Sequence, residues 1–483
     1  MRLVSALLVA TCTITAPLQG AREPVPSDEA AVVHALNRLA FGPRPGDVQR
    51  IRQMGLGRWI DQQLQPSGTP DPSLDARLAR LETLTLDSAT IARDYFLPAR
   101  QQRQARQRAA AQPGGASAPA EPGMQPAMND AIRQERRVFA ELSEAKVLRA
   151  VYSERQLEEV LVDFWFNHFN VFARKAQTAI YIGEYERDVI RPHVFGKFRN
   201  LLVATAKSPA MLIYLDNWQS VAPNAQTRRR IARAPNGRPP RGLNENYARE
   251  LLELHTLGVD SGYSQDDIVN VARAFTGWTV ERPAGGFRFA PNMHDRGVKK
   301  VLGHTIRAGG GIEDGEQVLD LVARHPSTAR HLAYKLAQRF VSDTPPVSLV
   351  DRAAQTFTKT DGDLRDVVRT IVTSPEFFDP SVRLAKVKTP FEFVVSALRA
   401  SSAEVRRGPA LIRALMEMGM PLYLCQPPTG YGDTAEAWVS SGALVTRINF
   451  AVALAGGQLR GVQLPASVRA NALALGSAEF QKQ

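Results

Sequence analysis

The sequence predicts an all-α protein, with one large multi-helix globular domain and one small β-hairpin near residues 286–305. Apolar residues recur at helical spacing along most of the chain, and only one short segment alternates as a strand does. Hydrophobic residues make up 44% of the 483 residues and charged residues 22%, which is the balance of a globular protein with a sizeable core. Beyond the first residues, no run approaches the ~18 apolar residues of a membrane helix. We therefore expect no transmembrane segment in the mature chain.

Residues 1–21 are typical of an export signal. Arg2 supplies a positive n-region, and residues 3–14 form an apolar h-region of the usual length. After cleavage near Ala21, Cys425 would be the only remaining thiol, so the mature chain cannot form an internal disulfide. The sequence therefore predicts a protein exported to the periplasm or the extracellular medium, one that relies on its core for stability.

Residues 22–99 are predicted to form an N-terminal helical block. Ser27 is a favourable N-cap, and acidic residues follow it in the first turn, where the helix dipole favours them. Gly42 and Pro43 end this first helix. Residues 100–130, rich in Gln, Ala, Pro, Gly and Arg, resemble a low-complexity insert with no core of its own.

Residues 131–460 are predicted to form the main helical domain, followed by a C-terminal tail over 461–483. A broad apolar stripe runs from Leu157 to Phe172, and an Arg/Pro-rich loop over 222–243 interrupts the domain. A helix is expected over 245–257, closed by Gly258. Residues 286–290 alternate as a strand, and we expect residues 300–304 to be their partner.

Positive charge is concentrated in two segments. The net charge is +12, and ten arginines fall in two clusters: Arg100, Arg103, Arg106 and Arg108 in the first, and Arg228, Arg229, Arg230, Arg233, Arg238 and Arg241 in the second. Such clusters either bind an anionic polymer or an acidic surface, or form solvated loops. Because the chain is predicted to be exported, we expect no nucleic-acid partner. Lys386 and Lys388 either bind an anionic group or are solvated, and solvation is the commoner case for lysines.

The helix after Asn244 carries a polar ridge. Asn246, Arg249, Glu250 and Glu253 are spaced so that they share one face. Two carboxylates, an amide and a guanidinium can hold an acid/base pair or oxygen ligands, which makes Glu250, Arg249 and Asn246 the candidate catalytic residues. The alternative is a solvated, ion-paired face, because Glu245 and Arg249 have the favourable i, i+4 spacing.

Histidines provide the candidate metal ligands. His168 and His255 lie among apolar residues, and His294 with Asp295 falls in a loop. Together with Glu250 they would make a histidine and carboxylate cluster suited to Zn²⁺ or a similar divalent cation. The alternative is that each is a satisfied core histidine, because no local spacing such as H-E-x-x-H occurs. Further polar candidates are Asn167, Asn244, Glu245 and Lys299.

Several segments in order resemble a known bacterial family. They are RLAFGP at 38–43, FWFNHF at 164–169, NENYARELLELHTLG at 244–258, ARAFTGW at 272–278, KTPFEFV at 388–394, GMP at 419–421 and QPP at 426–428. The sequence resembles, over most of its mature length, the family catalogued as domain of unknown function 1800. The resemblance implies an exported bacterial protein of uncharacterised activity. It also implies a partner, because members are often encoded beside an exported sulfatase-like or phosphatase-like family.

Two classes of function follow. The first is a metal-assisted hydrolase or transferase acting on envelope or environmental polymers, in which His168 and His255 are ligands, Glu250 is a ligand or general base, and Arg249 holds an anionic group. The second is a non-enzymatic partner, or an export or assembly factor, for the sulfatase-like protein. Convergence of these residues on one pocket would favour the enzyme, and dispersal would favour the partner.

Overall fold

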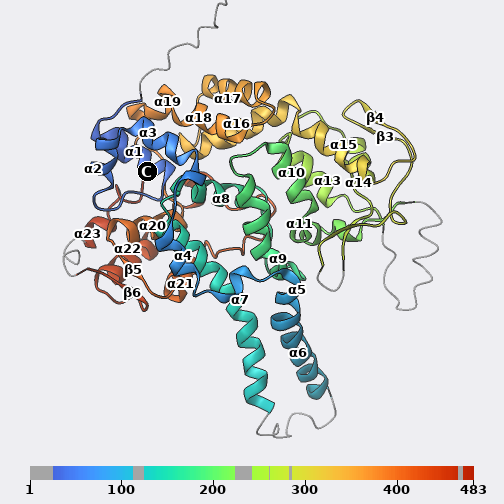
Figure 1. Ribbon diagram of the computed structural model, residues 1–483, viewed down its shortest axis with the longest axis horizontal. Helices are drawn as coiled ribbons and strands as arrows, with labels where there is room; N and C mark the ends of the chain where they lie inside the picture. Colours follow the sequence, from blue (N-terminus) through green and yellow to red (C-terminus); the bar gives the residue numbers. More distant parts are fainter. Residues whose placement is uncertain (1–24, 112–123, 224–241, 260, 282–284, 466–471) are drawn as a thin grey trace, which may run out of the picture.

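The computed structural model describes residues 25–111, 124–223, 242–259, 261–281, 285–465 and 472–483. Within these ranges the chain is mainly helical, and its strands form only two-stranded antiparallel sheets (Figure 1), which confirms the all-α prediction. No helix in the described ranges is both long enough and apolar enough to cross a bilayer. The predicted export signal and most of the predicted Arg/Pro-rich loop lie outside the described residues.

The helices follow one another through the whole described chain. In the first half they are α1 (Glu29–Leu39), α2 (Asp47–Met54), α3 (Leu56–Gln63), α4 (Pro72–Leu78), α5 (Ser88–Ile91), α6 (Leu97–Ala110), α7 (Met124–Tyr152), α8 (Gln156–His168), α9 (Thr178–Glu184), α10 (Phe198–Lys207) and α11 (Pro209–Tyr214). In the second half they are α13 (Asn246–Glu250), α14 (Gln265–Ala274), α15 (Ile312–Ala323), α16 (Pro326–Phe340), α17 (Val347–Lys359), α18 (Leu364–Val372), α19 (Pro375–Phe378), α20 (Pro390–Ala400), α21 (Pro409–Glu417), α22 (Ser441–Ala455) and α23 (Ala472–Leu475).

The N-cap of the first helix lies one residue after the predicted N-cap. Asp28, not Ser27, is the N-cap of α1, and its carboxylate accepts a hydrogen bond of 2.9 Å from the Ala31 N–H. A carboxylate in this position is also favoured by the positive end of the helix dipole. The predicted apolar face is buried, with Val32, Leu36 and Leu39 at most 2% exposed.

Part of the predicted low-complexity insert is helical. The pair formed by α6 and the first half of α7 projects from the body of the molecule (Figure 1). An ion pair of 2.5 Å between Arg103 and Glu135 joins the two helices of this projection. Most residues from 101 to 108 are exposed, so this end of α6 contributes little to the main core.

The strands pair with nearer neighbours than predicted. β2 (Phe287–Phe289) pairs with β1 (Trp278–Val280), and β3 (Lys299–Val301) pairs with β4 (His304–Ile306), so the predicted pairing of 286–290 with 300–304 is wrong. Leu302 and Gly303, both at positive φ, form a two-residue turn that folds β4 directly back on β3. A third pair joins β5 (Glu404–Val405) to β6 (Val462–Gln463).

The predicted C-terminal tail packs against the body. The backbones of Lys386 and Gln483 exchange hydrogen bonds of 3.2 and 2.8 Å. The Gln483 amide also donates a 3.0 Å hydrogen bond to Glu392, at the start of α20. The last residues therefore help to position a carboxylate of the candidate site.

Candidate functional site

Three hollows adjoin one another along one side of α16. The outer chamber, of about 380 Å³, shares Val259 and His331 with a middle chamber of about 180 Å³. The middle chamber shares Phe164, Asn167 and Asp433 with an inner chamber of about 60 Å³, which is room for a few water molecules. The three hollows therefore share wall residues in series, and their volume decreases from the outer chamber to the inner one.

The wall on α16 follows from helical periodicity. His331, Lys335 and Arg339 stand four residues apart, and such residues form one ridge along a helix. His331 lines the outer and middle chambers, Lys335 the middle chamber and Arg339 the inner one. One side of a single helix thus presents an imidazole, an ammonium and a guanidinium to successive depths of the same space.

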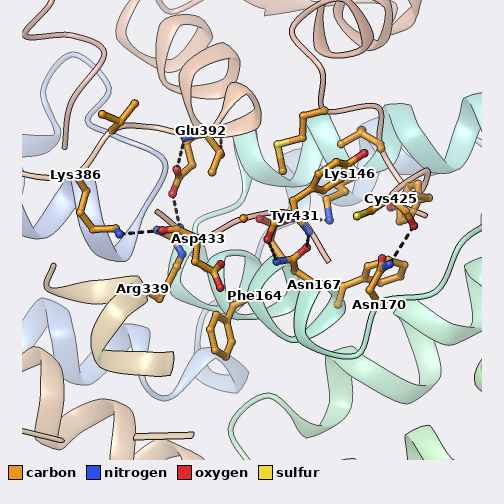
Figure 2. Close-up of a pocket in the computed structure, with 18 residues that line it drawn as sticks. Lys146, Phe164, Asn167, Asn170, Arg339, Lys386, Glu392, Cys425, Tyr431 and Asp433 are labelled. Carbon is orange, nitrogen blue, oxygen red and sulfur yellow. Dashed lines mark hydrogen bonds and ion pairs between the residues drawn. The ribbon is translucent and has the colours of Figure 1, made fainter. Parts of the chain in front are cut away.

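The opposite wall comes from α8 and the loop it holds. The Asn167 amide donates to the Tyr431 carbonyl at 2.9 Å, and its carbonyl oxygen accepts from the Tyr431 N–H at 2.7 Å (Figure 2). Gly430 has φ +73°, and a Cβ there would lie 2.4 Å from the backbone carbonyl oxygen of Asn167. Only glycine fits this position, because any side chain would push the loop away from α8.

Ion pairs that are buried or partly buried lie at the inner chamber. Lys146 pairs with Asp163 at 2.7 Å and Arg339 with Glu392 at 2.6 Å. Lys386 pairs with Asp343 and also donates to the Asp433 carbonyl at 3.1 Å. Lys386 and its neighbour Lys388 are each 4% exposed, so the expectation that they are solvated is wrong. Their ammonium groups are satisfied by a carboxylate or by carbonyl oxygens instead.

Glu392 holds its charge inside the protein because several donors surround it. It occupies the third position of α20 in a capping box, where its carboxylate accepts from the Thr389 N–H at 2.8 Å. Burial opposes ionisation, but Arg339 and the donors from Gln483 and Thr389 outweigh it and lower the pKa of Glu392 to about 2. The inner chamber therefore keeps an ionised carboxylate at its wall at neutral pH.

Two neutral histidines line the middle chamber. His168 Nε2 donates to the His255 carbonyl at 3.1 Å, and His331 Nε2 donates to the Leu254 carbonyl at 3.3 Å. Both carbonyls end a π-helical turn, Leu251–His255, which continues α13. Burial lowers the pKa of both histidines, and Lys335 adds to the effect in each case. Because Nε2 donates, the lone pair of each neutral ring lies on Nδ1.

His255 lies behind this wall rather than in it. Its side chain is 2% exposed, and its ring centre lies 6.2 Å from that of His168. Burial lowers the pKa of His255 to about 3, and its buried Nε2 has no hydrogen-bond partner among the described residues. The structure therefore brings His168 and His255 together, but only His168 lines a chamber.

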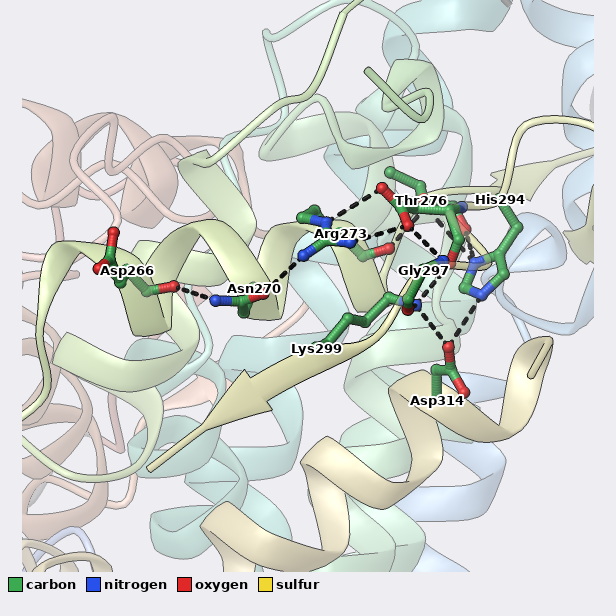
Figure 3. A network of polar contacts seen from close by, with 9 residues as sticks. Asp266, Asn270, Arg273, Thr276, His294, Gly297, Lys299 and Asp314 are labelled. Carbon is green, nitrogen blue, oxygen red and sulfur yellow. Dashed lines mark hydrogen bonds and ion pairs between the residues drawn. The ribbon is translucent and has the colours of Figure 1, made fainter. Parts of the chain in front are cut away.

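His294, Asp295 and Lys299 belong to a second network. His294 Nε2 lies 3.2 Å from a carboxylate oxygen of Asp314, to which Lys299 donates at 2.6 Å (Figure 3). Arg273 makes a two-pronged contact of 3.0 and 3.1 Å with Asp295. The side chains of His294 and Lys299 are completely buried, so this network ties the loop before β3 to α14 and α15.

The predicted five-residue ligand cluster is not assembled. Within the described ranges, no group of three or more histidine, cysteine, aspartate or glutamate residues is placed to hold a metal ion. His168 lines the middle chamber, and His255 lies close to it. His294 instead contacts Asp314, and Asp295 contacts Arg273. The donor set needed for a divalent cation is therefore divided between two networks.

A comparison with known families assigns the chain. The family model described as "Protein of unknown function (DUF1800)" matches residues 34–482. The chain belongs to this family. No match is found among curated proteins or among solved structures. Four of the segments that carry the DUF1800 resemblance, 164–169, 244–258, 388–394 and 419–421, contribute residues to the chambers.

The predicted polar ridge lies mostly at the surface of this DUF1800 chain. Asn246 is exposed, and its N–H donates to the Asn244 side chain at 2.9 Å. Arg249 lies 3.7 Å from Glu245, as the ion-paired alternative expects, and both also contact Gln265. Glu250 is half-buried; burial and the neighbouring Glu253 raise its pKa. Only Glu253 of this ridge lines a chamber.

Sequence reasoning singled out Glu253 and Lys386 but missed the other charged residues of the chambers. Lys335 and Arg339 fall in a segment recognised only as helical, although their spacing from His331 gave a usable signal. Asp433 and Lys146 lie in segments far from α16 in sequence, and no pattern links them to it. Asn167 and His168, by contrast, were selected from the sequence and do line the middle chamber.

Proposed function

We propose that this protein is exported to the cell envelope, where the three chambers bind the end of a polar chain-like molecule and hydrolyse or transfer its terminal group. The observation that carries the proposal is the series of three hollows along α16, which share wall residues and decrease in volume from the outer chamber to the inner one. We infer that the substrate of the protein is a fragment of an envelope or environmental polymer. The predicted export signal supplies the location.

The dimensions of the chambers support recognition of a chain end. Tyr334 and Val347, which are 40% and 63% exposed, line the outer chamber and offer apolar contact to a chain that extends into solvent. The inner chamber has room only for a small group. Convergent polar groups at the closed end of such a pocket fix the orientation of a ligand.

The middle chamber supplies acid/base groups without a metal. A neutral His331 can accept a proton at Nδ1 from an attacking water or hydroxyl group. Gly258 keeps this atom accessible, because a Cβ at Gly258 would lie 3.0 Å from it. The Lys335 ammonium, held by Asp433, stands in the same chamber and can stabilise negative charge that develops on the substrate. His168 lines the same chamber and is the second candidate for a proton acceptor.

The test is product release from polymer fragments. The mature protein is incubated with fragments of peptidoglycan, lipopolysaccharide and exopolysaccharide, and products are followed by mass spectrometry. We expect the protein to release a terminal group from one of these classes. Replacement of the proton acceptor (His331→Gln) or of the ammonium (Lys335→Met) should lower the rate by about 100-fold or more.

Matched variants outside the chambers provide the control. His304→Gln and Lys359→Met change the same side-chain types at exposed positions and should keep the wild-type rate. Product release that His331→Gln and Lys335→Met leave unchanged would place the chemistry elsewhere. Tight binding of a fragment, detected by native mass spectrometry without product, would leave the chambers as a binding site and refute the hydrolase or transferase part.

A second candidate is the non-enzymatic partner, or export or assembly factor, for an exported sulfatase-like protein. One observation favours it: His294, Asp295 and Lys299, selected as site residues, form a sealed network whose contacts are structural. The exposed arginines of α6 would then add contacts to an acidic partner or an anionic polymer. Co-expression of the two proteins and isolation of a stoichiometric complex would test this candidate.

A further inference from the structure

A groove between α21 and α22 lies outside the chambers. It has a volume of about 760 Å³, and Ala414, Phe450 and Leu459 contribute apolar surface to it. Thr446 and Asn449 of α22 add hydrogen-bonding groups to the same wall. The groove is therefore concave and mixed in character, apolar with polar groups at intervals.

One edge of the groove continues into an exposed apolar ridge. Val445, Ile448 and Val452 of α22 are 55%, 39% and 56% exposed. They follow the i, i+3, i+7 spacing of a helix face, although the opposite face of α22 already buries Phe450 and Leu454 in the protein. One apolar face is enough to pack α22 on the core, so its second apolar face is not needed for that packing. An exposed row of apolar side chains beside a groove is a candidate interaction surface.

The groove is rimmed by positive charge. Arg407, Arg413 and Arg460 line it, and none of them forms an ion pair within the described ranges of the chain. Glu417 is the only acidic residue among those that line it. Most other arginines of the body are paired with carboxylates. The positive charge of the three rim arginines is therefore free to attract an acidic group.

We propose that this groove binds an amphipathic helix of a partner protein, with an apolar stripe flanked by acidic residues. The stripe would lie against the ridge of Val445, Ile448 and Val452, and its carboxylates would face the arginine rim. A helix in a groove is a common mode of peptide recognition. A flat bilayer surface fits less well, because it cannot fill a concave groove or satisfy Thr446 and Asn449. This proposal is independent of the chemistry assigned to the chambers.

The probe is a fluorescein-labelled synthetic 18-residue peptide with leucines at i, i+3, i+4 and i+7 and glutamates on both flanks. Fluorescence anisotropy measures its binding to the full mature protein. We expect saturable binding that weakens as salt rises from 50 to 300 mM. Val452→Asp and Arg413→Glu should each weaken it at least tenfold. A lysine-flanked peptide with the same stripe should bind an Arg413→Glu/Arg460→Glu double variant better than the wild type.

Exposed residues elsewhere provide matched controls. Val298→Asp and Arg288→Glu should leave the anisotropy titration unchanged, and circular dichroism confirms that each variant is folded. The proposal is overturned if neither peptide binds or if Arg413→Glu has no effect. It is also overturned if the protein sediments with phosphatidylglycerol vesicles through Val452 without binding peptide, or if sedimentation reveals a dimer that Val452→Asp dissociates.

Discussion

Glu392 shows at the residue scale how this fold holds charge in its interior. The carboxylate is 4% exposed, and its oxygens accept hydrogen bonds from Gln483 and from the Thr389 N–H, while Arg339 lies at 2.6 Å. Removal of one partner of a buried pair leaves the other uncompensated, which costs about 3–5 kcal/mol. The pair therefore fixes the start of α20 against α16, where the inner chamber forms.

The low pKa of Glu392 predicts an acid-dependent loss of stability. Its folded pKa of about 2 lies below the ordinary 4.5, so its contribution is complete above pH 4.5 and is lost as the pH falls toward 2. Between pH 5 and pH 3 this group alone should remove about 2 kcal/mol from the free energy of unfolding. Urea denaturation at each pH measures it.

A variant without this carboxylate separates its effect from that of other acids. Glu392→Gln should be less stable at pH 7, but the difference from the wild type should shrink by about 2 kcal/mol at pH 3. The exposed Glu313→Gln should follow the wild type throughout. Parallel pH curves for Glu392→Gln and the wild type would contradict the assignment.

At the scale of elements, the polar network around Asp314 joins parts that the sequence pattern leaves separate. Lys299 of β3 and His294 of the preceding loop both meet the same carboxylate on α15. The alternation of apolar residues indicated the strands, but it carried no information on their partners. The Leu302–Gly303 turn decided the pairing, and its sequence lacks the Asn-Gly pattern that announces such turns. Helices were easier to predict, since their periodicity is local.

Neutralising Asp314 should destabilise this whole region. In Asp314→Asn the buried ammonium of Lys299 loses its only carboxylate contact in the described ranges, so the free energy of unfolding should fall by about 3–5 kcal/mol. Asp320→Asn on the same helix removes a half-exposed pair with Arg199 and should cost no more than about 1 kcal/mol. Equal losses in the two variants, measured by denaturant titration, would refute the structural role of the network.

For the whole molecule, fold class and family were predictable, whereas the candidate site was predictable only in part. Helical spacing and short motifs identify elements without knowledge of their neighbours, and Asn167 and His168 were found in this way. The chambers depend on contacts between distant segments: Lys335 and Asp433 are 98 residues apart, and Lys146 reaches Asp163 from another helix. A single sequence does not encode such pairs in any local spacing. Five metal ligands were grouped from residue types alone, and the fold divides them.

Shortening the projection formed by α6 and α7 would show whether the stability of the body depends on it. The body begins where α7 becomes buried, at Glu141 and Leu142, whereas residues 101–108 are mostly exposed. Replacement of residues 105–133 by a short Gly/Ser turn keeps Arg103 and Glu135, which form an ion pair between the two helices. Because residues 105–108, 130 and 133 are exposed, the free energy of unfolding should change by less than about 1 kcal/mol. A loss of several kcal/mol in denaturant titrations would instead make the projection an integral part of the folding unit.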